Sequence, residues 1–74
     1  MTLAPADRDI RYNLAVTCVR LADLSRALPL LEALVRDQPR DRPAWQELGR
    51  LYARLGRGAE SSAARQHAEA LPDP

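Results

Sequence analysis

Groups able to perform catalysis are scarce in this sequence. It has one histidine, His67, and one cysteine, Cys18, and no second such residue lies at the spacing of a metal site. No glycine-rich loop could hold a phosphate, and no paired carboxylates stand where burial would perturb them. We therefore expect a protein that is not an enzyme and that uses no metal or cofactor. His67 is expected to be a partly exposed helix residue and Cys18 a small buried one, with a reactive thiol as the alternative for Cys18.

The charged residues point away from nucleic acid as a partner. The net charge is only +1, and every one of the eleven basic residues is an arginine. A short basic strip runs through Arg50, Arg54 and Arg57, but Glu47 and Glu60 interrupt it. Acidic and basic residues otherwise alternate at helical spacing, which is typical of solvated helix faces.

Length and composition indicate one small globular domain, residues 1–74. Hydrophobic residues make up 46% of the sequence and charged residues 28%. The longest uncharged apolar stretch, "ALPLL", is too short to cross a bilayer, and "MTLAPADRD" lacks the features of a secretory signal. We expect a cytoplasmic protein with no membrane partner. The excess of arginine, alanine and leucine indicates the codon usage of a GC-rich, bacterial genome, the alternative being arginine chosen for recognition.

The spacing of the apolar residues predicts helices, and these helices must position any binding site. They recur at helical spacing from Ile10 to Leu21 and from Ala27 to Val35. The short "ADLS" between these segments makes them antiparallel, with Asp23 or Ser25 capping the second helix. Pro29 lies near the start of that helix, so we expect a local distortion and not a break.

Two further helices follow. Pro39 ends the second helix, and Asp41 is expected to cap a third one, with Pro43 in its first turn. Gly56 and Gly58 should supply the turn that closes the third helix. A fourth helix is expected over residues 59–71. No segment is predicted to be a strand, so the fold class is all-α.

A shift of 34 residues superimposes the first helix pair on the second, for example Leu14 on Leu48 and Leu21 on Leu55. Within "AWQELGRLY", Trp45, Leu48, Gly49 and Tyr52 follow a known repeat pattern. This pattern is tryptophan, any two residues, leucine, glycine, any two residues and tyrosine. The protein resembles the tetratricopeptide repeat family, with repeats at 8–41 and 42–74. The resemblance implies two antiparallel helix-turn-helix hairpins stacked as a short solenoid.

Several residues are expected to hold this architecture together. These structural positions are Leu14, Ala15, Ala27, Trp45, Leu48, Gly49 and Tyr52. Gly49 would let two helix backbones approach closely, and Ala15 would do the same in the first copy. The last helix diverges, because Ser61 and Arg65 stand where the first copy has Ala27 and Leu31.

The register of the last helix therefore stays open. A slip of two residues would instead place its packed face on Ala63, His67, Ala70 and Leu71.

By resemblance, the function is to bind a partner protein or peptide in the groove lined by the first helix of each repeat. The groove positions are Asp9, Tyr12, Asn13, Val16, Val19 and Arg20 in the first copy and Pro43, Gln46, Glu47, Arg50, Ala53 and Arg54 in the second. Arg20, Arg50 and Arg54 would make one end basic and suited to an acidic segment or to the carboxyl terminus of a partner. The alternative is that these arginines are only solubility charges. The lysine and asparagine pattern that clamps a terminal carboxylate is absent, which disfavours binding of chaperone tails.

A second hypothesis follows from the number of repeats. Stacked repeats usually need about three units for stability, and this protein has two. Its second helix is apolar nearly all round, which would leave one side uncovered. The apolar residues of that helix are Leu28, Leu30, Leu31, Leu34 and Val35. The protein could therefore be a self-associating homo-oligomer or assembly subunit, or a fragment of a longer repeat protein.

Overall fold

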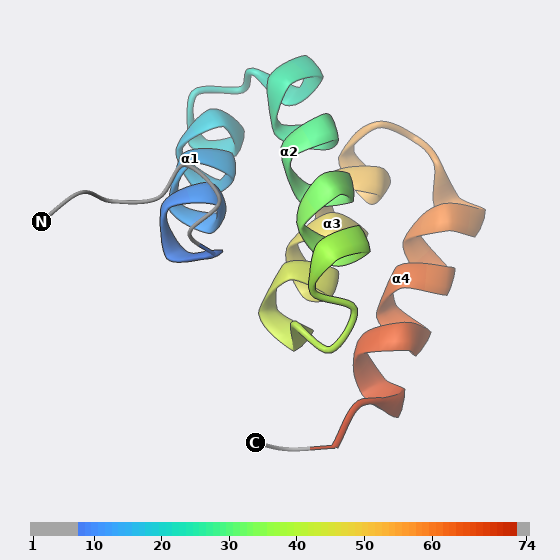
Figure 1. The fold of residues 1–74 in the computed structure, drawn as a ribbon. Helices are drawn as coiled ribbons and strands as arrows, with labels where there is room; N and C mark the ends of the chain where they lie inside the picture. Colours follow the sequence, from blue (N-terminus) through green and yellow to red (C-terminus); the bar gives the residue numbers. More distant parts are fainter. Residues whose placement is uncertain (1–7, 73–74) are drawn as a thin grey trace, which may run out of the picture.

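The computed structural model describes residues 8–72, and these residues fold into helices without strands. The helices are α1 (Arg8–Arg20), α2 (Leu24–Asp37), α3 (Arg42–Arg54) and α4 (Gly58–Ala70). Helices α1 and α2 form one hairpin and α3 and α4 form the other, while α2 packs on α3 (Figure 1). The all-α class and the two stacked hairpins predicted from the sequence are confirmed.

The N-terminal caps of α2 and α3 differ. The Asp41 side chain accepts a hydrogen bond of 3.3 Å from the Ala44 amide, as predicted, and a proline occupies the first turn of α3. Asp23 precedes α2, but its side chain makes no capping hydrogen bond, and Ser25 lies inside the helix. The prediction of a side-chain cap for α2 was wrong. The carboxylate of Asp23 instead lies 3.4 Å from Nε of Arg26.

Both hairpins turn through the same backbone motif. At the end of α3, the Arg57 amide donates to the Tyr52 carbonyl at 2.8 Å, with Gly56 at a φ of 74°. At the end of α1, the Asp23 amide donates to the Cys18 carbonyl at 2.8 Å, with Ala22 at a φ of 59°. This is a Schellman turn, which needs one residue in the left-handed region. Gly58 is not part of the turn, contrary to prediction, because it is the first residue of α4.

The core lies where the hairpins meet. The largest fully buried side chains all belong to the two inner helices, namely Leu31 and Leu34 of α2 and Leu48 and Leu51 of α3. The outer helices bury only small or medium residues, and these are Ala15, Cys18, Ser61, Ala64 and Ala68. Pro29 does not interrupt α2, which continues to Asp37.

Leu14 is the structural position that the sequence placed wrongly. Its side chain is 50% exposed, whereas its counterpart Leu48 is 2% exposed. The reason is that α3 lies between α2 and α4, while α1 has α2 as its main neighbour. The two leucines are equivalent in the 34-residue repeat, but only α3 has a main neighbouring helix on each side.

The face of α4 that packs on α3 carries Ser61, Ala64 and Ala68, so the alternative register with His67 on the packed face was wrong. Ser61 occupies the place of Ala27 in the first copy, and its hydroxyl donates a hydrogen bond of 2.8 Å to the Gly49 carbonyl. A Cβ added to Gly49 would lie 3.1 Å from Cγ of Arg65 and 3.6 Å from Cβ of Ala64. Helices α3 and α4 therefore approach closely at Gly49.

The turn after α1 yields the first prediction. Substitution Ala22→Gly removes the cost of holding an alanine in the left-handed region and should stabilise the fold by about 1 kcal/mol. For a domain of this size, that corresponds to a rise in Tm of about 4–8 °C. Gly56→Ala is the matched control and should lower Tm, because alanine is less stable than glycine in the left-handed region. No neighbour lies within 4 Å of the added Cβ, so this effect acts without a steric clash. A lower Tm for Ala22→Gly would contradict this account.

Gly49 yields the second prediction. Gly49→Ala should change the free energy of unfolding by less than about 1 kcal/mol, because the gain in helix propensity opposes the crowding against Arg65. Gly49→Leu, also a good helix former, should destabilise by about 2 kcal/mol, because the longer side chain has no room beside Ser61 and Ala64. Urea denaturation measures both values. Equal stability of the leucine variant and the wild type would show that the close approach is unimportant.

Candidate partner-binding groove

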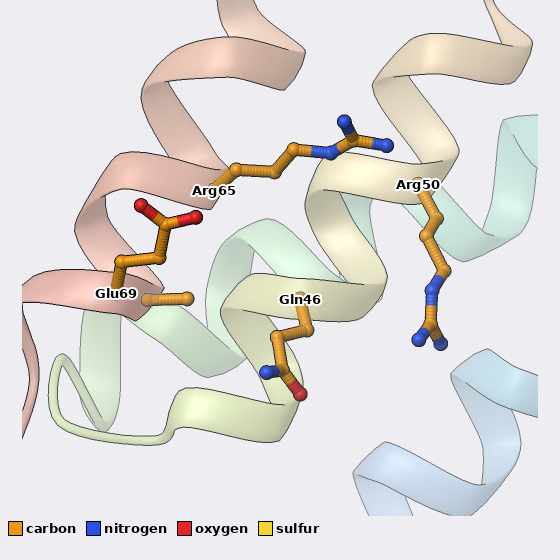
Figure 2. A pocket seen from close by; sticks show the side chains of 5 residues that line it. Gln46, Arg50, Arg65 and Glu69 are labelled. Atoms are coloured by element: carbon orange, nitrogen blue, oxygen red, sulfur yellow. The ribbon is translucent and has the colours of Figure 1, made fainter.

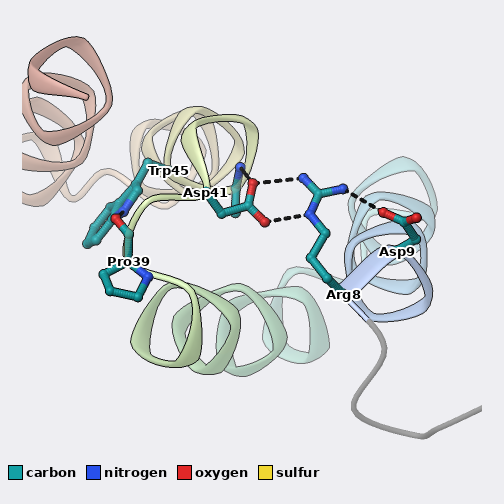
Figure 3. A network of polar contacts seen from close by, with 6 residues as sticks. Arg8, Asp9, Pro39, Asp41 and Trp45 are labelled. Carbon is teal, nitrogen blue, oxygen red and sulfur yellow. Dashed lines mark hydrogen bonds and ion pairs between the residues drawn. The ribbon is translucent and has the colours of Figure 1, made fainter. Parts of the chain in front are cut away.

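An arginine–aspartate fork joins the starts of α1 and α3. Arg8 donates from Nε and Nη2 to the two carboxylate oxygens of Asp41, at 2.5 and 2.7 Å (Figure 3). Its Nη1 also donates to Asp9 at 3.1 Å. Because Asp41 caps α3 at the same time, a single carboxylate contacts the starts of both helices.

The charges of this fork are mutually stabilised. The hydrogen bonds from Arg8 hold the pKa of the Asp41 carboxyl below its ordinary value, in spite of the burial that opposes this shift. Asp41 in turn raises the pKa of the Arg8 guanidinium. Both groups are therefore ionised at neutral pH.

Tyr12 lies next to the fork on the side of α1 that faces α3. The guanidinium carbon of Arg8 is 4.4 Å from the centroid of the Tyr12 ring. Burial, with a smaller contribution from Glu47, raises the pKa of Tyr12. Glu47 accepts a hydrogen bond of 2.6 Å from Nη1 of Arg50. The structure thus brings together Tyr12, Glu47 and Arg50 from the set of predicted groove residues.

The last turns of α1 and α3 carry Arg20 and Arg54. Arg54 donates from Nη1 to the Val19 carbonyl at 3.3 Å, which connects the last turns of α1 and α3. Arg20 is exposed in the last turn of α1, and within residues 8–72 it forms no ion pair. Arg50 is paired with Glu47, so the uncompensated positive charge lies at Arg20 and Arg54.

The remaining groove candidates are dispersed. Asp9 and Asn13 are exposed on α1, Val16 and Val19 are half-buried, and Pro43 and Ala53 are exposed on α3. Gln46 lies one turn before Arg50 on the same face of α3, beside a hollow of about 250 Å³ between α3 and α4. The hollow is lined by Gln46, Arg50, Arg65, Ala68 and Glu69. In Figure 2, Arg65 extends from α4 toward α3, whereas Arg50 points away from Arg65.

Sequence reasoning missed several contacts that shape this region. It did not place Arg8 or Asp41 in the groove, and it did not pair Trp45 with His67, whose ring centroids are 3.9 Å apart. His67 is exposed, as expected, but its ring stacks on the indole. Trp45 also donates from Nε1 to the Pro39 carbonyl at 2.9 Å. The signal was available, because an antiparallel α3–α4 hairpin brings the start of α3 beside the end of α4.

Tyr52 connects the two hairpins. Its hydroxyl donates a hydrogen bond of 2.8 Å to Glu32 of α2. Burial, together with this carboxylate, raises the pKa of Tyr52 to about 12. The phenol therefore stays protonated at neutral pH and can keep donating to Glu32.

Residues 8–72 contain no group of three or more histidine, cysteine or acidic side chains that could hold a metal ion. None of the helices in this range has the length and apolar character needed to span a membrane.

Helix hairpins stacked through an α2–α3 contact define a helical-repeat protein. The model of the tetratricopeptide repeat family matches residues 8–51, more than half of the sequence, and the protein belongs to this family. Repeats of the family typically act as non-catalytic modules of protein–protein interaction. Comparisons with curated proteins and with solved structures gave no significant match.

The fork yields the third prediction. Asp41→Asn keeps a side group able to cap α3 but removes the ion pair, and should destabilise by about 1 kcal/mol at neutral pH. The pKa of Asp41 is lower in the folded protein than its ordinary value of 3.8. The ionised carboxylate therefore stabilises the fold at pH values above 3.8, and this stabilisation is lost as the pH falls through the lowered pKa. The difference in stability between wild type and variant should therefore shrink at acid pH.

Thermal unfolding at a series of pH values checks this prediction. Asp23→Asn is the matched control, because Asp23 faces an exposed arginine and makes no cap, and it should change Tm little at any pH. A difference between wild type and Asp41→Asn that grows toward acid pH would contradict the role of the ionised carboxylate.

Proposed function

We propose that the protein binds an extended acidic segment of a partner protein in the groove between α1 and α3. The observation that carries the proposal is the pair of uncompensated arginines, Arg20 and Arg54, in the last turns of α1 and α3, two helices whose starts are joined by the Arg8–Asp41 fork. Membership of the tetratricopeptide repeat family supports a role in protein interaction. The guanidinium group is planar and donates in a fork that matches a carboxylate.

Arg50 can contribute a third contact to the same ligand. Its side chain is 67% exposed and its pair with Glu47 spans a single turn of α3. Pairs of this kind contribute at most about 1 kcal/mol, so a ligand carboxylate can compete for Arg50 at little cost. Tyr12, beside Glu47, offers an aromatic surface for an apolar residue of the ligand.

Selection from a random-peptide library tests the proposal, and this gives the fourth prediction. The wild-type protein should enrich peptides rich in aspartate and glutamate. Arg50→Glu combined with Arg54→Glu should weaken binding of a selected peptide by more than about tenfold, which corresponds to about 1.4 kcal/mol. Fluorescence anisotropy with the labelled peptide measures the affinity, and circular dichroism verifies that the variant is still helical.

Arg36→Glu combined with Arg40→Glu is the matched control. These arginines are exposed at the end of α2 and in the loop after it, outside the groove, and the pair makes the same change in net charge. Weakening by the control as large as that by the groove variant would indicate attraction to overall charge alone. Enrichment of peptides without acidic residues would overturn the proposed ligand.

A further inference from the structure

One face of α1 is apolar and open, although the corresponding face of α3 is closed. In α3 this face carries Ala44, Leu48 and Leu51, which are buried where α3 packs on α2. The residues at the same places in α1 are Ile10, Leu14 and Thr17, and all of them are exposed. The sequence thus repeats a helix-packing surface in α1, but no described helix covers it.

The open surface continues onto α2. Leu21, just after α1, is 75% exposed, and a recess of about 400 Å³ lies beside Leu14. The recess is lined by Leu14, Cys18, Ser25, Arg26, Pro29 and Leu30. We name the surface formed by Ile10, Leu14, Leu21, Pro29 and Leu30 the open end face. It is shared between α1, the turn after it and α2, whereas the sequence had suggested an uncovered side on α2 alone.

The opposite end of the molecule has the reverse character. In the first hairpin, α3 packs on a surface of apolar residues. Each of these residues has a counterpart in the second hairpin, 34 positions later in the sequence. Tyr12, Val16, Leu31, Leu34 and Val35 correspond to Gln46, Arg50, Arg65, Ala68 and Glu69. Those counterparts line the polar hollow between α3 and α4. A second copy cannot stack head to tail, because that would bury Arg65 and Glu69 against leucines.

We propose that the open end face binds the same face of a second copy, with the two α1 helices antiparallel about a two-fold axis. Such a contact places apolar residues against apolar residues, as an isologous interface requires. Asp9 and Arg20 lie about three turns apart on the same flank of α1. In an antiparallel pair, Asp9 of each copy then faces Arg20 of the other, so the charges are complementary as well.

The dimer engages Asp9 and Arg20 at the edge of the proposed groove but leaves Tyr12, Arg50 and Arg54 free. Tyr12 is two residues from Leu14 and so lies about 200° away around α1, on the side that faces α3. Each dimer would therefore present two grooves. A partner with two acidic segments would bind it more tightly than a single groove allows, through effective concentration.

Sedimentation equilibrium of the 74-residue protein tests the proposal, and this is the fifth prediction. The wild-type protein should sediment as a dimer at micromolar concentrations. Leu14→Glu combined with Leu21→Glu should give a monomer that keeps its helical circular dichroism, since both side chains are exposed within one copy. Ala63→Glu combined with Ala70→Glu places the same two charges on exposed positions of α4 and should leave the dimer intact.

A charge exchange tests the antiparallel arrangement. Asp9→Arg alone should weaken the dimer by about tenfold, and adding Arg20→Asp should restore it, because the opposite charges again face each other. A monomeric wild-type protein, or a dimer unaffected by the two leucine substitutions, would overturn the proposal. A lack of restoration by the exchange would overturn the antiparallel geometry. Peptide binding in the groove is measured separately, so either proposal can fail alone.

Discussion

The contact between α2 and α3 is the interaction on which the rest of the structure depends. Each hairpin has an apolar face that it cannot bury by itself, and this contact buries one such face from each. Leu31 and Leu34 on one side and Leu48 and Leu51 on the other are fully buried there. The outer helices supply only small or medium buried residues, so their stability derives from packing on these two inner helices.

Polar contacts then set the geometry of the groove. The Arg8–Asp41 fork joins the starts of α1 and α3, and the contact of Arg54 with the Val19 carbonyl joins their ends. Tyr52 and Glu32 connect α3 to α2 at the same time. The spacing of α1 and α3 is therefore fixed at both ends, which would reduce the ordering cost of binding in the proposed groove.

Much of the fold was predictable, because it rests on local rules. The 3.6-residue periodicity located the helices, Asp41 marked the start of α3, and the spacing of Trp45, Leu48, Gly49 and Tyr52 indicated the repeat. Two local details were wrong, the side-chain cap of α2 and the place of Gly58, and the main error concerns which helices pack beside α1. Leu14 and Leu48 occupy the same place in the repeat, yet only Leu48 is enclosed. Side-chain pairs between distant segments, such as Arg8 with Asp41, require the tertiary arrangement and could not be read from spacing alone.

Native-state hydrogen exchange tests most directly the claim that the α2–α3 contact stabilises the whole molecule. Amides in the middle of α2 and α3 should exchange most slowly, at rates set by global unfolding, and those of α4 should exchange faster through local opening. The reason is that α4 buries only Ser61, Ala64 and Ala68 against a single neighbour. Exchange in α4 as slow as in α3 would contradict this account of the core.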